Sequence, residues 1–313
     1  MIRELKTSAR VKRYRIEIFL TFFFIFLGAF LVFSMAKIVG SLHSKVLAVG
    51  STKTKGAQTV NASASAKIIV ASPAASALAS PLATASAAPV VYSGFCLNVP
   101  VLLYHHVEPT ALAAAEGHAS LTVDNANFDK QMAYLAAAGY RSITADELTG
   151  AILGHSHIGK SVVVTLDDGY SDAFTYAYPI AQKYHIILNL MIPTGLMGNP
   201  GYLSWDQLKQ MVSGGATVYN HTWSHASLPA VSADKLKFEV TTAKDQLQSN
   251  LGKSSNVFTY PYGANNTAVI NYLRVQGYTA AFSTNPGTTQ CDSFIMSLHR
   301  TRVGNSSLSA YGL

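Results

Sequence analysis

The sequence predicts one α/β domain built on parallel strands, preceded by a membrane helix and a linker. From residue 91 onward, short apolar runs alternate with amphipathic helical patterns, as in sheets whose parallel strands are covered by helices. One long uncharged apolar stretch lies near the N-terminus. An Ala/Ser-rich segment containing three prolines separates this stretch from the rest of the chain.

Charge is distributed unevenly along the 313 residues, whose formal net charge is +7. Residues 1–90 contain 11 Lys or Arg and two acidic residues, whereas residues 91–313 have a net charge of −2. The basic character therefore belongs to the N-terminal segment, and the remainder gives no electrostatic reason to expect a nucleic-acid partner. Two cysteines also exclude a small disulfide-rich scaffold.

The apolar stretch, Ile18–Ala36, has 19 consecutive uncharged residues. A helix of that length rises about 28 Å, close to the thickness of the hydrocarbon layer. Six basic residues precede it, namely Arg3, Lys6, Arg10, Lys12, Arg13 and Arg15. Because basic flanks stay inside, we expect a cytoplasmic tail (1–17), a transmembrane signal-anchor (18–36) and an extracytoplasmic remainder at the cell membrane. Cleavage at the small-x-small pattern Ser34–Ala36, which gives a secreted protein, is the alternative.

Residues 37–90 are expected to be an Ala/Ser/Pro-rich extracytoplasmic linker, because their side chains are too small to build a core. Residues 91–313 number 223, enough for one barrel-sized unit. Amphipathic helices are predicted around Phe128–Leu135, after Ser204 and over Leu236–Leu251. The predicted strands are Val99–Tyr104, Ser161–Leu166, Ile186–Ile192, Ala216–Tyr219, Asn256–Tyr260 and Tyr278–Phe282. This alternation fits a barrel or an open doubly wound sheet.

Polar clusters follow four of the predicted strands. They are Leu103–His106, Thr165–Tyr170, His221–His225 and Thr259–Gly263. Because parallel strands end on the same rim, we expect these clusters to meet in one active site. His155 and His157, in contrast, are assigned to a solvated loop.

One carboxylate and two imidazoles from these clusters are predicted to bind a metal ion. His221 and His225 are four residues apart, a spacing that lets both rings converge from one helical turn. With Asp168 they form a ligand set that leaves a position open to water, as in hydrolytic metal sites. The adjacent Asp167 then remains available as a base.

These motifs resemble those of the NodB-like polysaccharide deacetylases, carbohydrate esterase family four. Thr165–Gly169 is similar to the family's T-F-D-D-G motif, His221–His225 is similar to its H-[ST]-x-x-H motif, and the resemblance covers most of residues 98–304. It implies a distorted (β/α)7-type barrel with outer helices. It also implies that Asp167 is the general base and that a divalent ion, most commonly zinc, is held by Asp168, His221 and His225. Water bound to this ion then attacks an N-acetyl carbonyl.

The resemblance implies further roles around the third motif. The backbone N–H of Tyr262 is expected to stabilise the oxyanion, and Tyr260, Pro261 and Trp223 are expected to contribute to the oxyanion or substrate site. The family's Arg before this motif is absent, so either Arg300 or Arg302 is expected beside Asp167.

The catalytic acid is expected near the start of the domain. The late Leu-x-His motif of the family is absent from its usual place, but Leu103–His105 is a Leu-x-His sequence. This order resembles the circularly permuted poly-β-1,6-N-acetylglucosamine deacetylases, which also share the Tyr-Pro-Tyr-Gly motif. The acid role is therefore assigned to His105, with His106 as the less favoured choice.

The two cysteines lie near opposite ends of the domain. Cys96 precedes the first predicted strand, and Cys291 lies shortly before the final strand that the resemblance implies near Arg300 and Arg302. First and last strands are neighbours in a closed barrel, and an exported domain permits disulfides. We therefore hypothesise a disulfide between Cys96 and Cys291.

Taken together, these features predict a membrane-bound, metal-dependent hydrolase. Its expected partner is an N-acetylglucosamine-containing polysaccharide at the cell surface, and its expected cofactor is Zn²⁺. The alternatives are a catalytically weak glycan-binding module, or a deacetylase of peptidoglycan, chitin-like oligomers or acetylated xylan. The insertion Glu108–Ala119 and the loop Gly195–Tyr202 are expected to line the cleft.

Overall fold

The computed structural model describes residues 92–313. The predicted cytoplasmic tail, the signal-anchor (18–36) and the linker (37–90) lie outside the described residues. In the described part of the chain, no helix is both long enough and apolar enough to cross a membrane.

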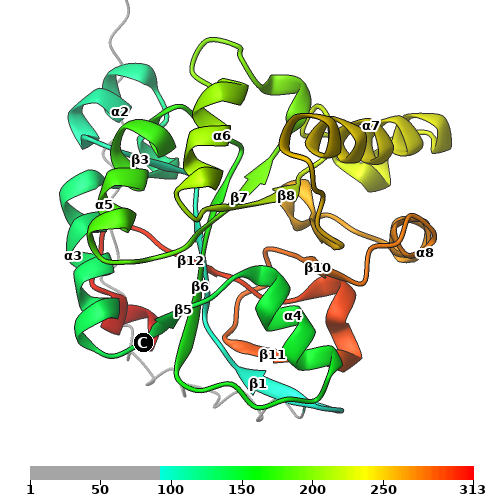
Figure 1. The fold of residues 1–313 in the computed structure, drawn as a ribbon, viewed down its shortest axis with the longest axis horizontal. Coiled ribbons are helices and arrows are strands. Elements are labelled where there is room, and N and C mark those ends of the chain that lie inside the picture. Colours follow the sequence, from blue (N-terminus) through cyan, green and yellow to red (C-terminus); the bar gives the residue numbers. More distant parts are fainter. Residues whose placement is uncertain (1–91) are drawn as a thin grey trace, which may run out of the picture. The chain divides into compact units, whose positions relative to one another are not determined.

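The domain is built on one curled sheet of seven parallel strands, in the order β10–β9–β8–β7–β6–β2–β12 (Figure 1). An eighth strand, β5 (Arg141–Ser142), pairs with the first two residues of β6. The seven strands are β2 (Val101–Tyr104), β6 (Ser161–Asp167), β7 (Leu188–Ile192), β8 (Thr217–Asn220), β9 (Val257–Thr259), β10 (Ala280–Phe282) and β12 (Thr301–Arg302). The predicted α/β architecture with parallel strands is confirmed, and the sheet takes the form of a distorted half-barrel.

Side chains on both faces of this sheet are buried, as β6 illustrates. Val162 and Val164 pack into one hydrophobic cluster, whereas Val163 belongs to the other, because successive side chains of a strand point to opposite faces. The first cluster includes side chains of α3 (Asn125–Ala137), α5 (Tyr178–Lys183) and α6 (Trp205–Ser213). The second includes side chains of α4 (Ala145–Leu153) and α8 (Thr267–Val275). Figure 1 shows α3 and α5 along one flank and α7 (Ala233–Leu251) and α8 along the other.

Local sequence signals explain most element boundaries. Strand β2 begins at Val101 rather than at the predicted Val99, because the intervening Pro100 has no N–H to donate to a ladder. Helix α6 begins with the predicted capping box, in which Ser204 and Gln207 each accept from the other's backbone N–H. Helix α7 ends at Gly252, whose φ of 72° lies in the left-handed region that glycine tolerates.

The two cysteines form a disulfide within a separate two-stranded ribbon. Strand β1 (Cys96–Asn98) pairs antiparallel with β11 (Thr289–Cys291), and Cys96 lies directly opposite Cys291. The predicted pairing is present, and the two strands of the ribbon come shortly before β2 and β12, the first and last strands of the sheet, which pair with each other. The bridge spans 195 residues of sequence. It lowers the conformational entropy of the unfolded chain, which stabilises the folded domain by about 5 kcal/mol in the chain-entropy description.

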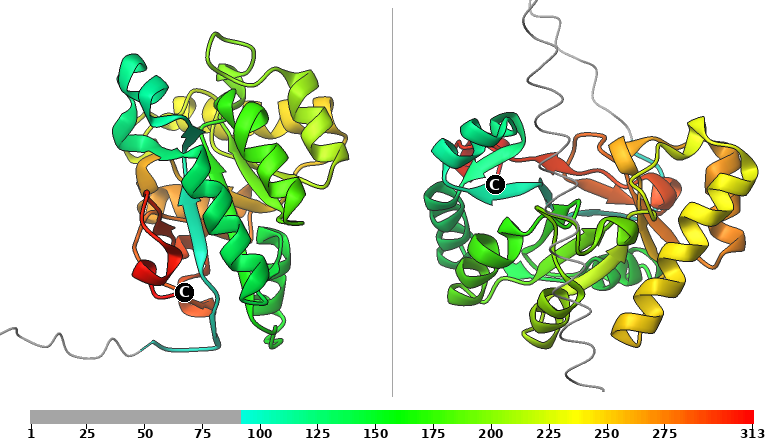
Figure 2. Two further views of the ribbon diagram at one scale, coloured as in Figure 1. Left: turned by 90° about the vertical axis from the view of Figure 1, so that its left-hand side faces the viewer. Right: turned by 90° about the horizontal axis from the view of Figure 1, so that it is seen from above.

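An insertion between β2 and α3 carries its own secondary structure. It consists of β3 (His106–Glu108), α2 (Thr110–Glu116) and β4 (Thr122–Asp124), and β3 pairs in parallel with β4. The insertion lies next to α3, as Figure 2 shows in cyan and teal. It therefore extends the rim on which β2 ends.

Candidate active site

Asp167, the last residue of β6, is fixed by a buried arginine. The two carboxylate oxygens of Asp167 accept hydrogen bonds from Nη1 and Nη2 of Arg300 at 2.7 and 2.8 Å. Arg300 is only 1% exposed and also donates from Nε to the carbonyl oxygen of Ser283. Burial raises the pKa of Asp167, but the Arg300 guanidinium, together with His221 and His105, outweighs this effect and leaves the pKa below its ordinary value. Of the two predicted arginines, Arg300 is therefore the partner of Asp167.

Asp168 lies between the two predicted imidazoles. Its Oδ1 atom is 3.1 Å from Nε2 of His225 and 3.4 Å from Nε2 of His221. Burial raises the pKa of Asp168, but the two imidazoles outweigh this and hold the pKa well below its usual range. Asp168, His221 and His225 thus converge on one point.

The loop that carries the two histidines is irregular, so the predicted helical turn is wrong. Thr222 and His225 have φ values of 70° and 60°, in the left-handed region. The imidazole of His221 is oriented by its Nδ1–H, which donates to the carbonyl oxygen of Thr259 at 2.9 Å. This bond leaves the Nε2 lone pair of His221 facing Asp168.

Glu239 of α7 anchors the same loop, and sequence reasoning missed it. Its buried carboxylate accepts hydrogen bonds from the backbone N–H groups of Trp223 and Ser224 at 2.9 and 2.7 Å. The hydroxyl of Ser224 donates to it at 2.6 Å, and Lys235 pairs with it at 2.7 Å. One feature of the sequence could have pointed to Glu239. It lies three residues after Leu236, which places a carboxylate among the apolar positions of an amphipathic helix.

His105 follows β2 and its ring lines the same cavity as the two aspartates. Burial lowers the pKa of His105, and this effect outweighs the opposing influence of Asp167 and Asp168. The ring is therefore neutral near pH 7. The alternative, His106, contacts Asp172 and lines a neighbouring cavity.

Only one of the four residues expected at the oxyanion or substrate site lines the cavity. Tyr262 does so, with φ of 60° and its hydroxyl 3.1 Å from Nδ1 of His225. Tyr260 is fully buried in the core, where its hydroxyl donates to the carbonyl oxygen of Met296, and Pro261 is also buried. Trp223 packs edge-on against Phe238 of α7. The side chains of Tyr260 and Pro261 therefore point away from this cavity, and the roles expected of Tyr260, Pro261 and Trp223 in oxyanion or substrate binding stay predictions.

The remaining predicted residues meet in one cavity of about 600 Å³. Its lining includes His105, Asp167, Asp168, His221, His225 and Tyr262. Four residues around it have left-handed backbone conformations, namely Asp168, Thr222, His225 and Tyr262. Such strained conformations in residues other than glycine cluster at functional sites. The strand ends therefore bring together residues that lie far apart in the sequence.

The profile of the family described as polysaccharide deacetylase matches residues 155–281, which include both the Asp167–Asp168 pair and the two histidines. The chain belongs to the polysaccharide deacetylase family. This is a family of hydrolases that act on carbon–nitrogen bonds.

Three relatives of this deacetylase show how far the similarity extends. The Bacillus subtilis protein YxkH, named as a polysaccharide deacetylase, is 27% identical over 217 residues, which cover 69% of this chain and 75% of YxkH. The poly-β-1,6-N-acetyl-D-glucosamine N-deacetylase of Staphylococcus aureus is 27% identical over 176 residues, covering 52% of this chain and 61% of that enzyme. The solved structure of the Streptococcus pyogenes deacetylase PplD in complex with acetate has a TM-score of 0.63 and 28% identity, covering 67% of this chain and 94% of PplD.

The donor set of the deacetylase fits a divalent metal ion. One ligand atom each from Asp168, His221 and His225 lie within 4.8 Å of one another. The Oδ1 atom of Asp168 is buried, yet neither imidazole meets it with hydrogen-bond geometry. An oxygen that faces two ring nitrogens in this way is suited to share a cation with them.

Proposed function

We propose that the domain hydrolyses N-acetyl groups of a polysaccharide that contains N-acetylglucosamine, outside the cell membrane. The observation that carries this proposal is the convergence of Asp168, His221 and His225 beside a separate carboxylate, Asp167, in one cavity. A glycan-binding module has no need of a base beside a metal-ligand set. The name of the Staphylococcus aureus relative supports a poly-N-acetylglucosamine substrate, as does the early position of His105.

In this proposal, the chain's own residues move the protons. Asp167 accepts a proton from the attacking water, and its bidentate contact with Arg300 fixes the orientation of its carboxylate. The backbone N–H of Tyr262 stabilises the negative charge that develops on the acetyl oxygen. That charge also favours uptake of a proton from solvent water by the nearby neutral His105, which then donates this proton to the departing amine as the carbon–nitrogen bond breaks.

We propose zinc as the ion held by Asp168, His221 and His225, since two imidazoles and a carboxylate suit this metal. When bound, zinc polarises a carbonyl and lowers the pKa of water. His221 contributes through the nitrogen that its bond to Thr259 leaves free.

The first expected result is acetate release that depends on zinc. Defined oligomers of β-1,6-linked N-acetylglucosamine, chitin, peptidoglycan and acetylated xylan are incubated with the full chain, with and without chelator. We expect release from the first substrate, loss with chelator and recovery with added Zn²⁺. His221→Ala should lower release at least roughly 100-fold by removing a ligand, whereas His157→Ala in the exposed loop should not. A chain that binds these glycans but releases no acetate with added zinc contradicts the proposal and favours the binding module.

We also propose that residues 18–36 anchor the enzyme in the cell membrane, on the basis of their uncharged length and the basic residues before them. The full chain should then sediment with membranes and require detergent for extraction. A chain lacking residues 1–36 should remain in the aqueous fraction. Recovery of a mature chain that begins after Ala36 would show instead that the segment is a cleaved signal peptide.

A further inference from the structure

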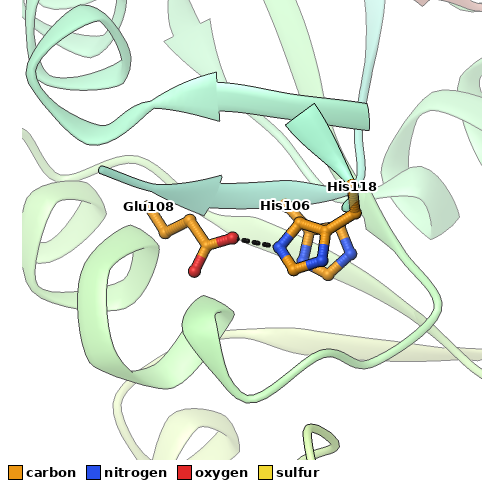
Figure 3. Close-up of side chains that lie close together, drawn as sticks. All are labelled: His106, Glu108 and His118. Atoms are coloured by element: carbon orange, nitrogen blue, oxygen red, sulfur yellow. Dashed lines mark hydrogen bonds and ion pairs between the residues drawn. The ribbon is translucent and has the colours of Figure 1, made fainter. Parts of the chain in front are cut away.

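A second cluster of two imidazoles and one carboxylate lies in the insertion after β2. His106 and Glu108 are two residues apart on β3 and point to the same side of that strand (Figure 3). His118, between α2 and β4, lies against both. One ligand atom from each of the three lies within 4.8 Å of the others. His106 and Glu108 are buried, and the side chain of His118 is 21% exposed.

A carboxylate fixes the orientation of the His106 ring, as is common for histidines that bind metals. Its Nδ1 lies 2.6 Å from Oδ2 of Asp172, whose other oxygen accepts the backbone N–H of Val107. A proton on Nδ1 satisfies Asp172 and leaves the Nε2 lone pair free, which is the common arrangement behind histidine ligands of metals. His221 is oriented in the same way by the carbonyl oxygen of Thr259.

The charges of this cluster favour a cation. Glu108 and Asp172 are buried carboxylates, and within residues 92–313 their ion-pair partners are His118 and His106 alone. The two imidazole rings are stacked with centroids 4.0 Å apart, and each contacts one of these carboxylates. One divalent ion compensates both carboxylates while the two rings remain neutral.

We propose that His106, Glu108 and His118 form a second divalent-cation site, with Asp172 as the positioning residue behind His106. Two imidazoles and a carboxylate suit zinc or a similar first-row transition metal rather than magnesium or calcium. His118 and Glu108 are in contact through Nε2 and Oε1, so an ion enters where that contact opens.

The second site is separate from the Asp168–His221–His225 site. The ring of Tyr170 stacks on His106 with centroids 3.7 Å apart, and Tyr170 lines the cavities of both sites. The cavity at the second site has a volume of about 510 Å³. Because His118 follows α2 and Leu121 lines both cavities, an ion bound here ties the segment after α2 to β3 and fixes one wall of the catalytic cavity.

The test is the number of zinc ions bound per full chain, measured by calorimetric titration with Zn²⁺ alone and by elemental analysis. We expect two equivalents for the wild-type chain and one for His221→Ala. Glu108→Gln and His118→Ala should each also lose one equivalent. Combining His221→Ala with His118→Ala should leave none. His155→Ala is the matched control, because His155 is an exposed histidine paired with a carboxylate, Asp292, at 3.1 Å, and it should retain two equivalents.

A single equivalent in the wild-type chain that disappears in His221→Ala overturns the proposal, as do two equivalents in Glu108→Gln and His118→Ala. Zinc X-ray absorption of the His221→Ala chain gives a check that does not require the second-site variants to fold. Two imidazole ligands on a tightly bound zinc support the second site only if His118→Ala, added to the same chain, removes that signal. A remaining zinc with no imidazole neighbours is adventitious and contradicts the second site. Failure of acetate release leaves these counts unaffected, so the two proposals fail separately.

Discussion

Asp167→Asn should reduce acetate release about 100- to 10,000-fold, the range that general-base catalysis contributes, while zinc affinity stays close to that of the wild type. Asparagine has nearly the same shape but cannot accept a proton from water. The proposed metal ligands Asp168, His221 and His225 remain in place. Steady-state acetate release and zinc titration of the same preparation measure the two effects.

The substitution also leaves the guanidinium of Arg300 buried without its counter-charge, so folding must be measured in parallel. Removing one partner of a buried ion pair costs about 3–5 kcal/mol of unfolding free energy. The matched control is Asp129→Asn, which breaks a more exposed pair with Lys183 at 2.8 Å and should cost under about 1 kcal/mol. If a folded Asp167→Asn chain kept more than about a tenth of the wild-type rate, Asp167 would not be the base.

Arg300→Met should have the next largest effect, on both stability and the pH dependence of activity. Without the guanidinium, only His221 and His105 still oppose the effect of burial, so the pKa of Asp167 should rise above its wild-type value. Asp167 must be ionised to act as a base, so activity should fall at a higher pH than in the wild type as the medium is acidified. The stability loss should again be about 3–5 kcal/mol at neutral pH.

Asp167 also determines how the stability of the domain depends on pH. In the wild type, the lowered pKa of Asp167 contributes stability above the ordinary carboxyl pKa, and this contribution is lost as the pH falls through the lowered value. Arg141→Met is the matched control, since Arg141 is exposed, pairs with Glu147 and is not among the residues that line the catalytic cavity. Denaturant unfolding and pH–rate profiles of both variants test the prediction. An unchanged acid limb in Arg300→Met would contradict it.

Much of the site could be predicted from sequence because strand order and direction decide where it forms. Asp167, Asp168 and His221 each lie at or just after the end of a parallel strand, and parallel strands end on one rim. This rule required no knowledge of side-chain conformation. The α/β architecture could also be predicted. An error of a few residues at the end of a strand or helix does not change the type or the order of the elements.

What could not be predicted depends on local geometry. Arg300 and Arg302 are two residues apart and so share a side of an extended segment; only the position along the strand places Arg300 against Asp167. Tyr260 and Tyr262 appear equivalent in the motif, but the left-handed conformation at Tyr262 directs that side chain to the cavity while Tyr260 enters the core. Glu239 was missed because its partners are backbone groups of a distant loop.

The order of strands in the sheet has a consequence for how the enzyme matures. Strand β2, which precedes His105, lies between β6 and β12, and Arg300 just before β12 comes near the end of the chain. During synthesis, β2 and β6 are made well before β12, the other neighbour of β2, and before Arg300, the counter-ion of Asp167. Contacts between residues distant in sequence slow folding, because the loop between them must close at a cost in conformational entropy. We therefore expect a chain that stops before Arg300 to lack hydrolytic activity.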